Sequence, residues 1–360
     1  MKQYQFGFIL EQALGHITHT KNLQATVEQD AAVRAYWGLI PFGTDGIAKS
    51  IPVFRSNWTI RAGVRARRAV MELTKAAALD ALFFHTQVPA ILSTDQLKRV
   101  PSVVSLDATP LQYDALGTVY GHQRGSAWLE RTKWRLNRDC FRAARHLITW
   151  SEWARQSLIH DYDVSPEKIT VIPPGVHVRE WLRPVSRTRT DAPVKILFVG
   201  GDFARKGGLL LLKSFRTLRS LGVELHVVTR DALSPEPGLF LYQNMQPNSP
   251  ALKALYHQAD IFCLPTYGDC LPMVLSEAGA AGLPVVSTHV AAIPEIVHDN
   301  KTGALIPIGD VEALTAALRK LVSDPAMRLR QGAQAIDTVS KQFDASQNTQ
   351  RLLSVLKQVA

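Results

Sequence analysis

Apolar runs of four to six residues alternate along the chain with segments in which apolar residues recur every three or four positions. The runs predict buried strands and the segments predict helices, and their alternation is typical of an α/β protein with parallel sheets. In the first half, strands are expected at 5–10, 32–37, 81–85, 102–106, 146–150 and 168–172, and helices at 16–29, 58–79, 126–144 and 151–160. A proline-rich, charged stretch at 173–193 predicts a linker. In the second half, strands are expected at 194–199, 224–229, 261–264 and 284–287, and helices at 208–221, 250–259, 271–281, 311–322, 325–343 and 346–359.

Two carboxylates lie eight positions apart in the segment from 261 to 288. Asp269 falls in the loop after the first strand of this segment, and Glu277 falls about two turns into the next helix. Ligands of open parallel sheets bind beside the carboxyl ends of the strands, where loop amides and helix N-termini meet. Glu277 stands among apolar helix positions, and a carboxylate in apolar surroundings usually has a partner or a function.

The start of the same helix is a candidate anion site. Pro272 suits the first helical turn, because proline lacks an amide that would be unpaired there in any case. The neighbouring amides of Leu271, Met273 and Val274 are then free to donate to a ligand. Such a group of amides suits a phosphate.

A second ligand-binding signal lies at residues 195–208, where a strand runs into glycines, two cations and the next helix. Gly200 and Gly201 allow the backbone to approach a ligand closely, and Arg205 and Lys206 add positive charge beside it. A glycine-rich loop alone is a weak signal. Together with the downstream acids, it predicts phosphate binding.

These stretches resemble the retaining glycosyltransferases of family 4, or glycosyl transferases group 1. The resemblance rests on an acid, seven residues, a glutamate and alanine, and then Gly-x-Pro-Val-Val, which here run from Asp269 through Glu277 to Val286. By this resemblance Glu277 binds the ribose hydroxyls of a nucleotide sugar and Asp269 contacts the donor sugar. Family members usually carry glutamate where Asp269 stands.

The family also places a lysine six residues after the first glycine of the loop, as Lys206 follows Gly200. By resemblance this lysine holds the donor diphosphate together with an arginine that usually follows the glycine. That arginine is replaced by Gly201 here, and Arg205 is the obvious substitute. Arg230, after a predicted strand, is a candidate to flank the nucleobase, with a solvated loop cation as the alternative.

The resemblance implies the GT-B fold, with two Rossmann-like domains facing across a cleft in which donor and acceptor meet. We expect an N-terminal acceptor-side domain over residues 1–178 and a donor-binding domain over 179–343. The last helix, in residues 344–360, would cross back onto the N-terminal domain.

Four residues of the N-terminal half are candidates for the acceptor side, and a fifth, Asp107, is a candidate catalytic residue together with Asp269, Lys206 and Arg205. Gly15 and His16 lie in the first strand-to-helix loop, and a polar helix cap is the alternative for His16. His85 and Ser151 follow predicted strands. Asp107 stands where many relatives have a histidine beside the transferred sugar, and it could accept a hydrogen bond from a hydroxyl or form a turn with the following Ala-Thr-Pro.

Positive charge is concentrated in the first half of the chain. The formal net charge is +10, and residues 1–190 hold 25 Lys and Arg against 16 Asp and Glu. On the helix predicted at 126–144 and just beyond it, arginines spaced by three or four share one face: Arg131, Arg135, Arg138, Arg142 and Arg145. A second cluster comprises Arg61, Arg65, Arg67 and Arg68. A solvated basic face is one interpretation, and attraction to anionic lipid headgroups or to an anionic acceptor is the other. No nucleic-acid partner is expected, because only charge supports one.

Composition and cysteine content further narrow the class of protein and its cellular compartment. With 360 residues, 46% hydrophobic and 20% charged, the chain is typical of a soluble globular protein. The N-terminal apolar segment is too short for a signal peptide, and three cysteines show no disulfide framework or metal-ligand spacing. We expect a cytoplasmic protein, with the inner face of the cell membrane as a peripheral location if the basic face binds lipid. Asp161 and Asp163 spell an Asp-x-Asp pattern, which can bind a metal, but they lie away from the predicted donor site. No metal cofactor is expected, because cations and helix amides are available for the diphosphate.

The sequence thus predicts a retaining transferase that moves a hexosyl unit from a UDP-sugar or GDP-sugar to a hydroxyl of a glycan, a lipid-linked acceptor or a small molecule. A nucleotide-sugar epimerase or phosphorylase fits the loop, Lys206 and acid spacing less well. The alternative is a catalytically degenerate GT-B protein that binds a nucleotide or a membrane, and the departures at Gly201, Asp107 and Asp269 keep it open.

Overall fold

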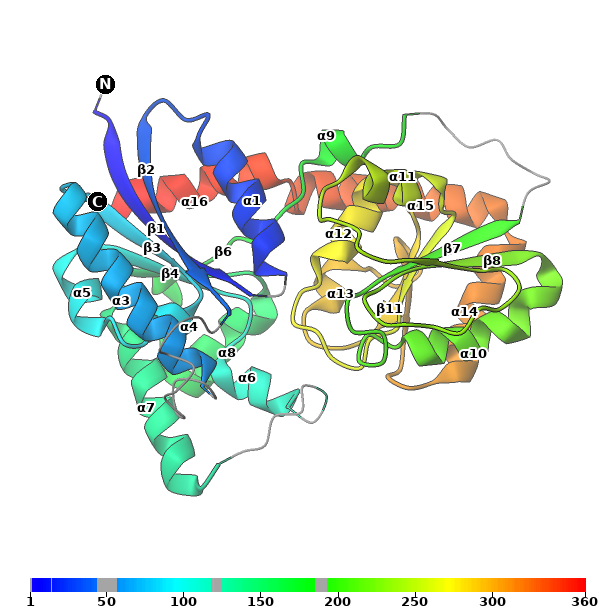
Figure 1. The fold of residues 1–360 in the computed structure, drawn as a ribbon, viewed down its shortest axis with the longest axis horizontal. Coiled ribbons are helices and arrows are strands. Elements are labelled where there is room, and N and C mark those ends of the chain that lie inside the picture. Colours follow the sequence, from blue (N-terminus) through cyan, green and yellow to red (C-terminus); the bar gives the residue numbers. More distant parts are fainter. Residues whose placement is uncertain (1, 14, 44–56, 118, 120–124, 185–192) are drawn as a thin grey trace. The chain divides into compact units, whose positions relative to one another are not determined.

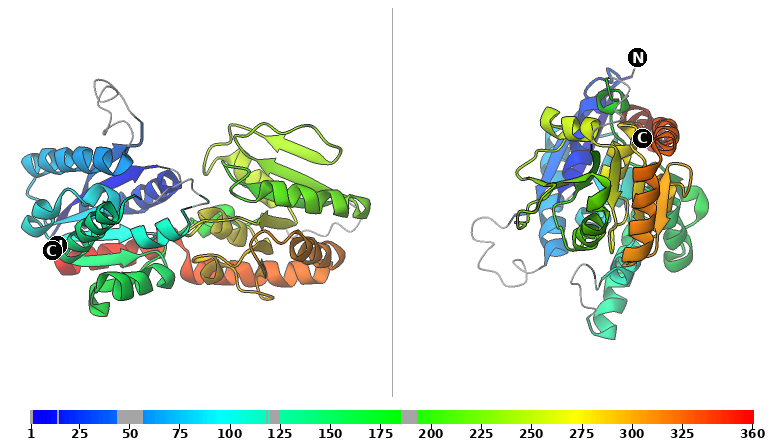
Figure 2. Two further views of the ribbon diagram at one scale, coloured as in Figure 1. Left: turned by 90° about the horizontal axis from the view of Figure 1, so that it is seen from below. Right: turned by 90° about the vertical axis from the view of Figure 1, so that its right-hand side faces the viewer.

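The chain forms two compact units, each built around one parallel sheet (Figures 1 and 2). The computed structural model describes residues 2–13, 15–43, 57–117, 119, 125–184 and 193–360. Within these, unit 1 comprises the parts at 1–117 and 122–174 together with Ala345–Ala360, and unit 2 comprises those at 118–121 and 175–344. The predicted α/β class is therefore confirmed.

The sheet of unit 1 has six parallel strands in the order β2-β1-β3-β4-β5-β6. Their bounds are β1 Tyr4–Gln12, β2 Val33–Pro41, β3 Ala81–His85, β4 Ser102–Leu106, β5 His146–Thr149 and β6 Ile169–Val171. The chain moves outward from β1 to β2 and then returns to the other side of β1 with β3. Ligands of such sheets bind where the strand order changes direction, which here is at the carboxyl ends of β1 and β3.

Helices cover both faces of this sheet. Alternate strand residues serve opposite faces, so Phe83 packs in one cluster and Phe84 in the other. One face is covered by α1 (His16–Val27) and α16 (Ala345–Val359). The other is covered by α3 (Trp58–Ala76), α4 (Gln87–Ala90), α5 (Thr94–Arg99), α7 (Ala127–Ala143) and α8 (Glu152–Tyr162).

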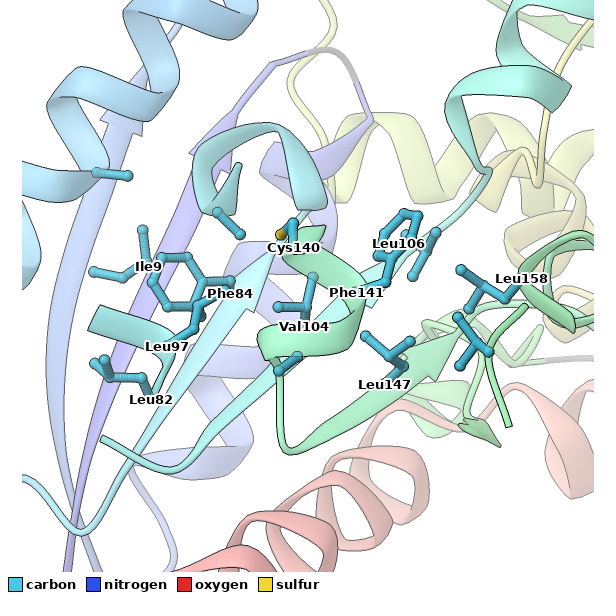
Figure 3. Close-up of a cluster of buried hydrophobic side chains, with 14 of the residues drawn as sticks. Ile9, Leu82, Phe84, Leu97, Val104, Leu106, Cys140, Phe141, Leu147 and Leu158 are labelled. Atoms are coloured by element: carbon cyan, nitrogen blue, oxygen red, sulfur yellow. The ribbon is translucent and has the colours of Figure 1, made fainter. Parts of the chain in front are cut away.

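Figure 3 shows the second of these clusters. Phe84, Val104 and Leu147 project from neighbouring strands toward Cys140 and Phe141 of α7, and all five are fully buried. Burying an apolar side chain of this size contributes roughly 1.5–3 kcal/mol to the stability of the fold. The cluster therefore holds strands β3, β4 and β5 in place.

The last helix belongs to unit 1, as the resemblance implied. Leu352, Leu353 and Leu356 of α16 are buried in the cluster that contains Phe6 and Phe8 of β1. Near the end of α16, the Lys357 ammonium lies 3.2 Å from a carboxylate oxygen of Asp30.

Unit 2 repeats the plan, with six parallel strands in the order β12-β11-β10-β7-β8-β9. Their bounds are β7 Val194–Val199, β8 Val223–Val228, β9 Leu239–Tyr242, β10 Ile261–Leu264, β11 Val285–Thr288 and β12 Gly303–Ile306. Here the change of direction lies between β7 and β10. The loops after these two strands are those that carry the predicted phosphate and sugar residues.

In unit 2, α10 (Gly208–Leu218) and α14 (Val311–Ser323) pack together on one side of the sheet (Figure 1). On the other side are α11 (Pro250–Gln258), α12 (Met273–Ala280) and α15 (Pro325–Gln342). The remaining described helices are α6 Pro110–Ala115, α9 Val178–Trp181, α13 Ile293–Ile296, and the 3-10 turns η2 Pro166–Lys168 and η3 Arg219–Leu221.

Some sequence predictions need correction. The stretch predicted as a linker contains helix α9, whose Trp181 is 1% exposed and lies edge-on to Tyr256 with ring centroids 5.0 Å apart. The rest of that prediction at 185–192 lies outside the described residues. Pro272 is the N-cap of α12 rather than a residue of its first turn. Arg145 lies beyond the end of α7 and so does not share its helical face.

Candidate functional site

The lysine and the first acid singled out in the sequence meet in unit 2. The Lys206 ammonium forms an ion pair with a carboxylate oxygen of Asp269, and both side chains are about 15% exposed. Burial first, and the charge of Arg205 second, lower the pKa of the Lys206 ammonium to about 7. The contact with Asp269 acts in the opposite direction, because an adjacent carboxylate favours the charged lysine.

The two loops that carry this pair are tied together by their backbones. The Tyr267 amide donates to the Arg205 carbonyl at 3.0 Å, and Arg205 Nη1 donates to the Gly268 carbonyl at 2.8 Å. Gly207 has φ +80, and a Cβ there would lie 1.9 Å from the Pro265 carbonyl oxygen. The close approach therefore requires glycine at this position.

Arg205 is engaged within its own loop. Its Nε lies 3.2 Å from a carboxylate oxygen of Asp202, and its amide donates to the other oxygen at 3.0 Å. Together with the bond to Gly268, these contacts make Arg205 a brace between the loops.

Glu277, the second acid, is almost fully buried on α12, the helix that follows the Asp269 loop. It is 4% exposed, and its Oε2 accepts a hydrogen bond from the Tyr256 hydroxyl at 2.8 Å. Burial raises the pKa of Glu277 to about 7, while the hydroxyl of Tyr256 and the charge of Lys253 act to lower it. In the described part of the chain, the other oxygen, Oε1, has no hydrogen-bond partner.

Tyr256 was not predicted as a site residue. It is fully buried on α11 and stacks on Phe262, with ring centroids 5.5 Å apart. In the sequence it lies among the apolar residues of α11, and this pattern predicts only that its side chain is buried in the core. A tyrosine hydroxyl inside a core usually has a polar partner, and that is the one clue that the sequence offered.

The N-terminus of α12 keeps the free amides that were expected. Among the described residues, nothing accepts hydrogen bonds from the amides of Leu271, Met273 and Val274. Unpaired amides at a helix start carry partial positive charge and suit an anion. The position of Pro272 at the N-cap does not change this.

Arg230 follows β8 and is exposed. Its Nε donates to the Gly201 carbonyl at 3.3 Å. Gly200 and Gly201 follow β7, which is the neighbouring strand.

Unit 1 brings a second polar cluster together at the carboxyl ends of β1 and β3. His16 Nδ1 lies 2.8 Å from His85 Nε2, and His16 Nε2 lies 3.7 Å from Glu11 Oε1. The Thr86 hydroxyl donates to Glu11 Oε2 at 2.9 Å, and Trp58 also donates to this carboxylate. Burial is the main cause that raises the pKa of Glu11, and the charge of Asp107 adds to it.

Two further rings complete this cluster. Trp150 stacks on His85 with ring centroids 5.0 Å apart, and His19 lies 4.7 Å from the same imidazole. Burial lowers the pKa of His19 to about 3 and that of His85 well below its usual value, so both are neutral near pH 7. Sequence reasoning found His16 and His85 but missed Glu11 and His19, which reach the cluster from the end of β1 and the second turn of α1.

The other acceptor-side candidates have local roles. Ser151 is the fully buried N-cap of α8 and accepts from the Ala154 amide at 3.1 Å. Gly15 is the N-cap of α1 with φ −68, and a Cβ there would meet nothing within 4 Å. Asp107 is half-buried in a bend after β4. Asp163, from the Asp-x-Asp pattern, is the C-cap of α8 and pairs with Arg138 at 3.0 Å.

The second arginine cluster is not a free basic surface. Arg61 is 5% exposed and its guanidinium carbon lies 5.6 Å from the Trp58 ring. Arg67 pairs with Asp95, Arg68 pairs with Glu72 at 2.8 Å, and Arg65 donates to a backbone carbonyl. On α7, by contrast, Arg131, Arg135 and Arg142 are exposed.

Two negative findings concern the described residues alone. None of their helices combines the length and the apolar character needed to cross a membrane. They also contain no group of three or more His, Cys, Asp or Glu side chains that could hold a metal ion.

The chain is similar to known proteins over both halves. The Glycosyltransferase Family 4 model matches residues 23–180, and the Glycosyl transferases group 1 model matches residues 193–324. D-inositol 3-phosphate glycosyltransferase of Corynebacterium glutamicum is 29% identical over 208 residues, which cover 51% of this chain and 50% of that protein. Glycogen synthase of Mycobacterium tuberculosis is 26% identical over 316 residues, which cover 84% of this chain and 73% of that protein. The match thus spans about half the length of the first relative.

Solved structures agree over nearly the whole chain. Sucrose-phosphate synthase from Thermosynechococcus elongatus superposes with a TM-score of 0.77 at 15% identity, covering 99% of both chains. The Anabaena protein HepE in complex with UDP-glucose gives 0.72 at 17% identity, covering 98% of this chain and 99% of that one. At such identities the likeness shows the fold, which is GT-B. Because sequence models match both halves and the fold agrees, the chain belongs to the family 4, group 1 type of glycosyltransferases.

Proposed function

We propose that this chain is a retaining glycosyltransferase that moves a hexosyl unit from a nucleoside-diphosphate sugar to an acceptor hydroxyl. The observation that carries this proposal is the pairing of Lys206 with Asp269 where unit 2 changes strand direction. Glu277 follows on the helix that starts beside the pair. A cation for phosphate, an acid for the sugar and an acid for the ribose are thus supplied by one edge of one sheet.

The ion pair stabilises the two buried charges of the site before the donor binds. Lys206 and Asp269 neutralise each other, which limits the cost of holding each charge in a largely buried place. A donor diphosphate would take the place of Asp269 beside the Lys206 ammonium. Asp269 would then be free to accept a hydrogen bond from a sugar hydroxyl.

The departing nucleoside diphosphate is stabilised electrostatically. Its developing charge would be met by Lys206 and by the unpaired amides of Leu271 and Met273. Arg205 adds charge next to Lys206 while it braces the loop. The acceptor hydroxyl attacks from the face that the diphosphate leaves, through an oxocarbenium-like state, so the anomeric configuration is retained. Asp269 serves as a sugar ligand in this scheme rather than as a covalent nucleophile.

Glu277 supplies the ribose contact. Its Oε2 is held by Tyr256, and Oε1 is the oxygen that remains for the ribose hydroxyls. Arg230, which donates to the Gly201 carbonyl in the same unit, is proposed as a further donor-binding residue. The complex of the Anabaena neighbour with UDP-glucose supports a UDP-sugar as the first donor to test, with a GDP-sugar as the second.

The histidine cluster of unit 1 is proposed for the acceptor side. His16 and His85 present linked imidazoles at the β1 and β3 strand ends, held by Glu11. Asp107 lies near enough to influence the pKa of Glu11. Gly15 and Ser151 define the starts of the two helices there and act through backbone geometry. The acceptor itself is a hydroxyl of a glycan, a lipid-linked sugar or a small molecule.

Donor hydrolysis tests the reaction without knowledge of the acceptor. The protein is incubated with a UDP-hexose and, separately, a GDP-hexose, and proton NMR follows release of the sugar. We expect slow hydrolysis of one donor, with the first sugar formed in the donor's own anomeric configuration, and no hydrolysis by Glu277→Ala. A product of inverted configuration would refute the retaining mechanism. Nucleotide binding without any turnover, with or without candidate acceptors, would favour the degenerate GT-B binding protein instead.

A membrane surface is proposed as a partner of α7. Trp128 and Leu129 in its first turn are 74% and 50% exposed, and Arg131 and Arg135 follow on the exposed side. An exposed tryptophan beside arginines suits the interface of an anionic bilayer. The protein would then be cytoplasmic and peripheral on the membrane.

Vesicle sedimentation tests this surface. Wild-type protein should sediment with vesicles that contain phosphatidylglycerol and remain free with phosphatidylcholine alone. Charge reversal at Arg131 and Arg135 should abolish binding, while reversal at the exposed Arg319 of unit 2 should not. Equal sedimentation of both variants would rule out α7 as the membrane surface. No nucleic-acid partner is proposed.

A further inference from the structure

The end of β8 brings Arg230 beside the glycine loop that follows β7. These strands are parallel neighbours (Figure 1). In their register Val199 pairs with Val228. Gly201 and Arg230 each lie two residues beyond these strand ends, and a hydrogen bond joins them there. Two segments that are 29 residues apart in sequence therefore meet at the glycine loop that follows β7.

Gly201 and Arg230 share one space. A Cβ at position 201 would lie 2.9 Å from Arg230 Nη2 and 3.0 Å from Nε, closer than side chains normally pack. Arg230 Nε also donates to the Gly201 carbonyl at 3.3 Å. The guanidinium therefore lies against the backbone at the place where a side chain of residue 201 would begin.

The preceding glycine is related to Lys206 in the same way. A Cβ at Gly200 would lie 3.1 Å from Cγ of Lys206. Consecutive glycines thus leave room for two cationic side chains, one from the end of the loop and one from the next strand. A diphosphate spreads its charge over two phosphorus centres, so two cationic side chains that reach the same loop suit it as a ligand.

Arg230 differs from Arg205 in its surroundings. Arg205 is held by Asp202 and by the Gly268 carbonyl, and the neighbouring Asp231 accepts from the Phe203 amide at 2.7 Å. In the part of the chain that the structure describes, Arg230 makes no ion pair with a carboxylate. Its Nη groups are thus available to an anionic ligand.

We propose that Arg230 is the guanidinium that binds the donor diphosphate beside Lys206, and that glycine at position 201 is required to make room for it. This inference rests on the proposed function, because it names a ligand contact within the donor site. It assigns Arg205 to bracing the loops and moves Arg230 from the nucleobase to the phosphates.

A double-mutant cycle between positions 201 and 230 tests the shared space. Calorimetric titrations with UDP, GDP, uridine and guanosine are made on wild type, Arg230→Ala, Gly201→Ala and the double variant. Loss of a hydrogen-bonded charge should weaken nucleoside-diphosphate binding in Arg230→Ala about 10- to 100-fold and leave nucleoside binding within about twofold. Gly201→Ala removes no charge, yet it should also weaken diphosphate binding, because its Cβ displaces the guanidinium. In the Arg230→Ala background it should have no further effect.

A rescue and three controls complete the experiment. Gly201→Arg combined with Arg230→Ala should recover part of the diphosphate affinity, since the space is then empty. Arg319→Ala, an exposed arginine of α14, should bind as wild type does, and circular dichroism checks that each variant folds. Glu277→Ala reports on the donor site as a whole.

The outcomes separate the two levels of the proposal. If wild type binds neither diphosphate, the proposed function fails and this inference fails with it. If wild type binds and Glu277→Ala does not, while Arg230→Ala binds as tightly as wild type, only the role of Arg230 is overturned. Independent, additive effects of Gly201→Ala and Arg230→Ala would overturn the shared space. Equal losses for diphosphate and nucleoside in Arg230→Ala would return Arg230 to the nucleobase.

Discussion

Replacing Glu277 by glutamine should stabilise the ligand-free protein at alkaline pH. The pKa of this buried carboxyl rises from 4.5 to about 7. Between these pH values the folded state keeps a proton that the unfolded state has lost, so stability falls as the pH rises through the window and is constant above it. At about 1.4 kcal/mol per pH unit, the accumulated cost at pH 8 is on the order of 3 kcal/mol.

Glutamine keeps an oxygen that can accept from Tyr256 but carries no charge. The hydrogen bond to a carboxylate is stronger than that to an amide by about 1 kcal/mol, which offsets part of the gain. We therefore expect Glu277→Gln to exceed wild type at pH 8 by about 1–3 kcal/mol in the free energy of unfolding. At pH 5, where Glu277 is protonated in the folded state, the two should differ by less than about 1 kcal/mol.

Urea unfolding of both proteins at pH 5 and pH 8 measures this difference. The exposed Glu312 of α14 provides the matched control, and Glu312→Gln should change stability little at either pH. The same Glu277→Gln protein should bind nucleoside diphosphates more weakly, because the amide is a poorer acceptor for ribose hydroxyls. A stability difference between Glu277→Gln and wild type that is the same at both pH values would refute the reasoning.

Three further predictions concern Tyr256, Lys206 and His19. Tyr256→Phe removes the hydroxyl that Glu277 accepts from, and it should cost about 1–3 kcal/mol at pH 8, measured by urea unfolding; no change would show that the hydrogen bond contributes nothing. Lys206→Ala should reduce donor hydrolysis at least 100-fold, by NMR, while Lys206→Arg should retain more activity; equal activity in both variants would contradict a role for the charge. The lowered pKa of His19 means that the folded state lacks a proton that the unfolded state gains, so stability should fall by up to about 1.4 kcal/mol per pH unit below pH 6.5. His19→Asn should make this decline shallower in urea unfolding, and an unchanged slope would contradict it.

The sequence predicted the central strands well because parallel strands covered on both faces are continuous apolar runs. Residues 81–85, 102–106, 194–199 and 261–264 coincide with β3, β4, β7 and β10. Strand β9, Leu239–Tyr242 at the sheet edge, was missed although its four residues form an apolar run like those that predicted the other strands. Helix α9 was missed because four residues are too few to show a helical period.

The candidate site was predictable where its signals are local. Spacing along two loops and one helix was enough to single out Lys206, Asp269 and Glu277. The partners that come from other elements were not predictable in this way. Tyr256 reaches Glu277 from another helix, Glu11 reaches His16 across a loop, and Arg230 meets Gly201 only through strand register. Contacts of this kind depend on the order of strands, which no single stretch of sequence states.

Binding of nucleoside diphosphates is the measurement that tests the account most directly. Titrations of UDP, GDP and ADP into wild type and Glu277→Ala are followed by thermal shift, because a ligand that binds only the folded state raises its melting temperature. The account predicts a concentration-dependent rise with one of these nucleotides and no rise in the folded Glu277→Ala protein. No rise with any of the three in well-folded wild type, or an equal rise in both proteins, would contradict it.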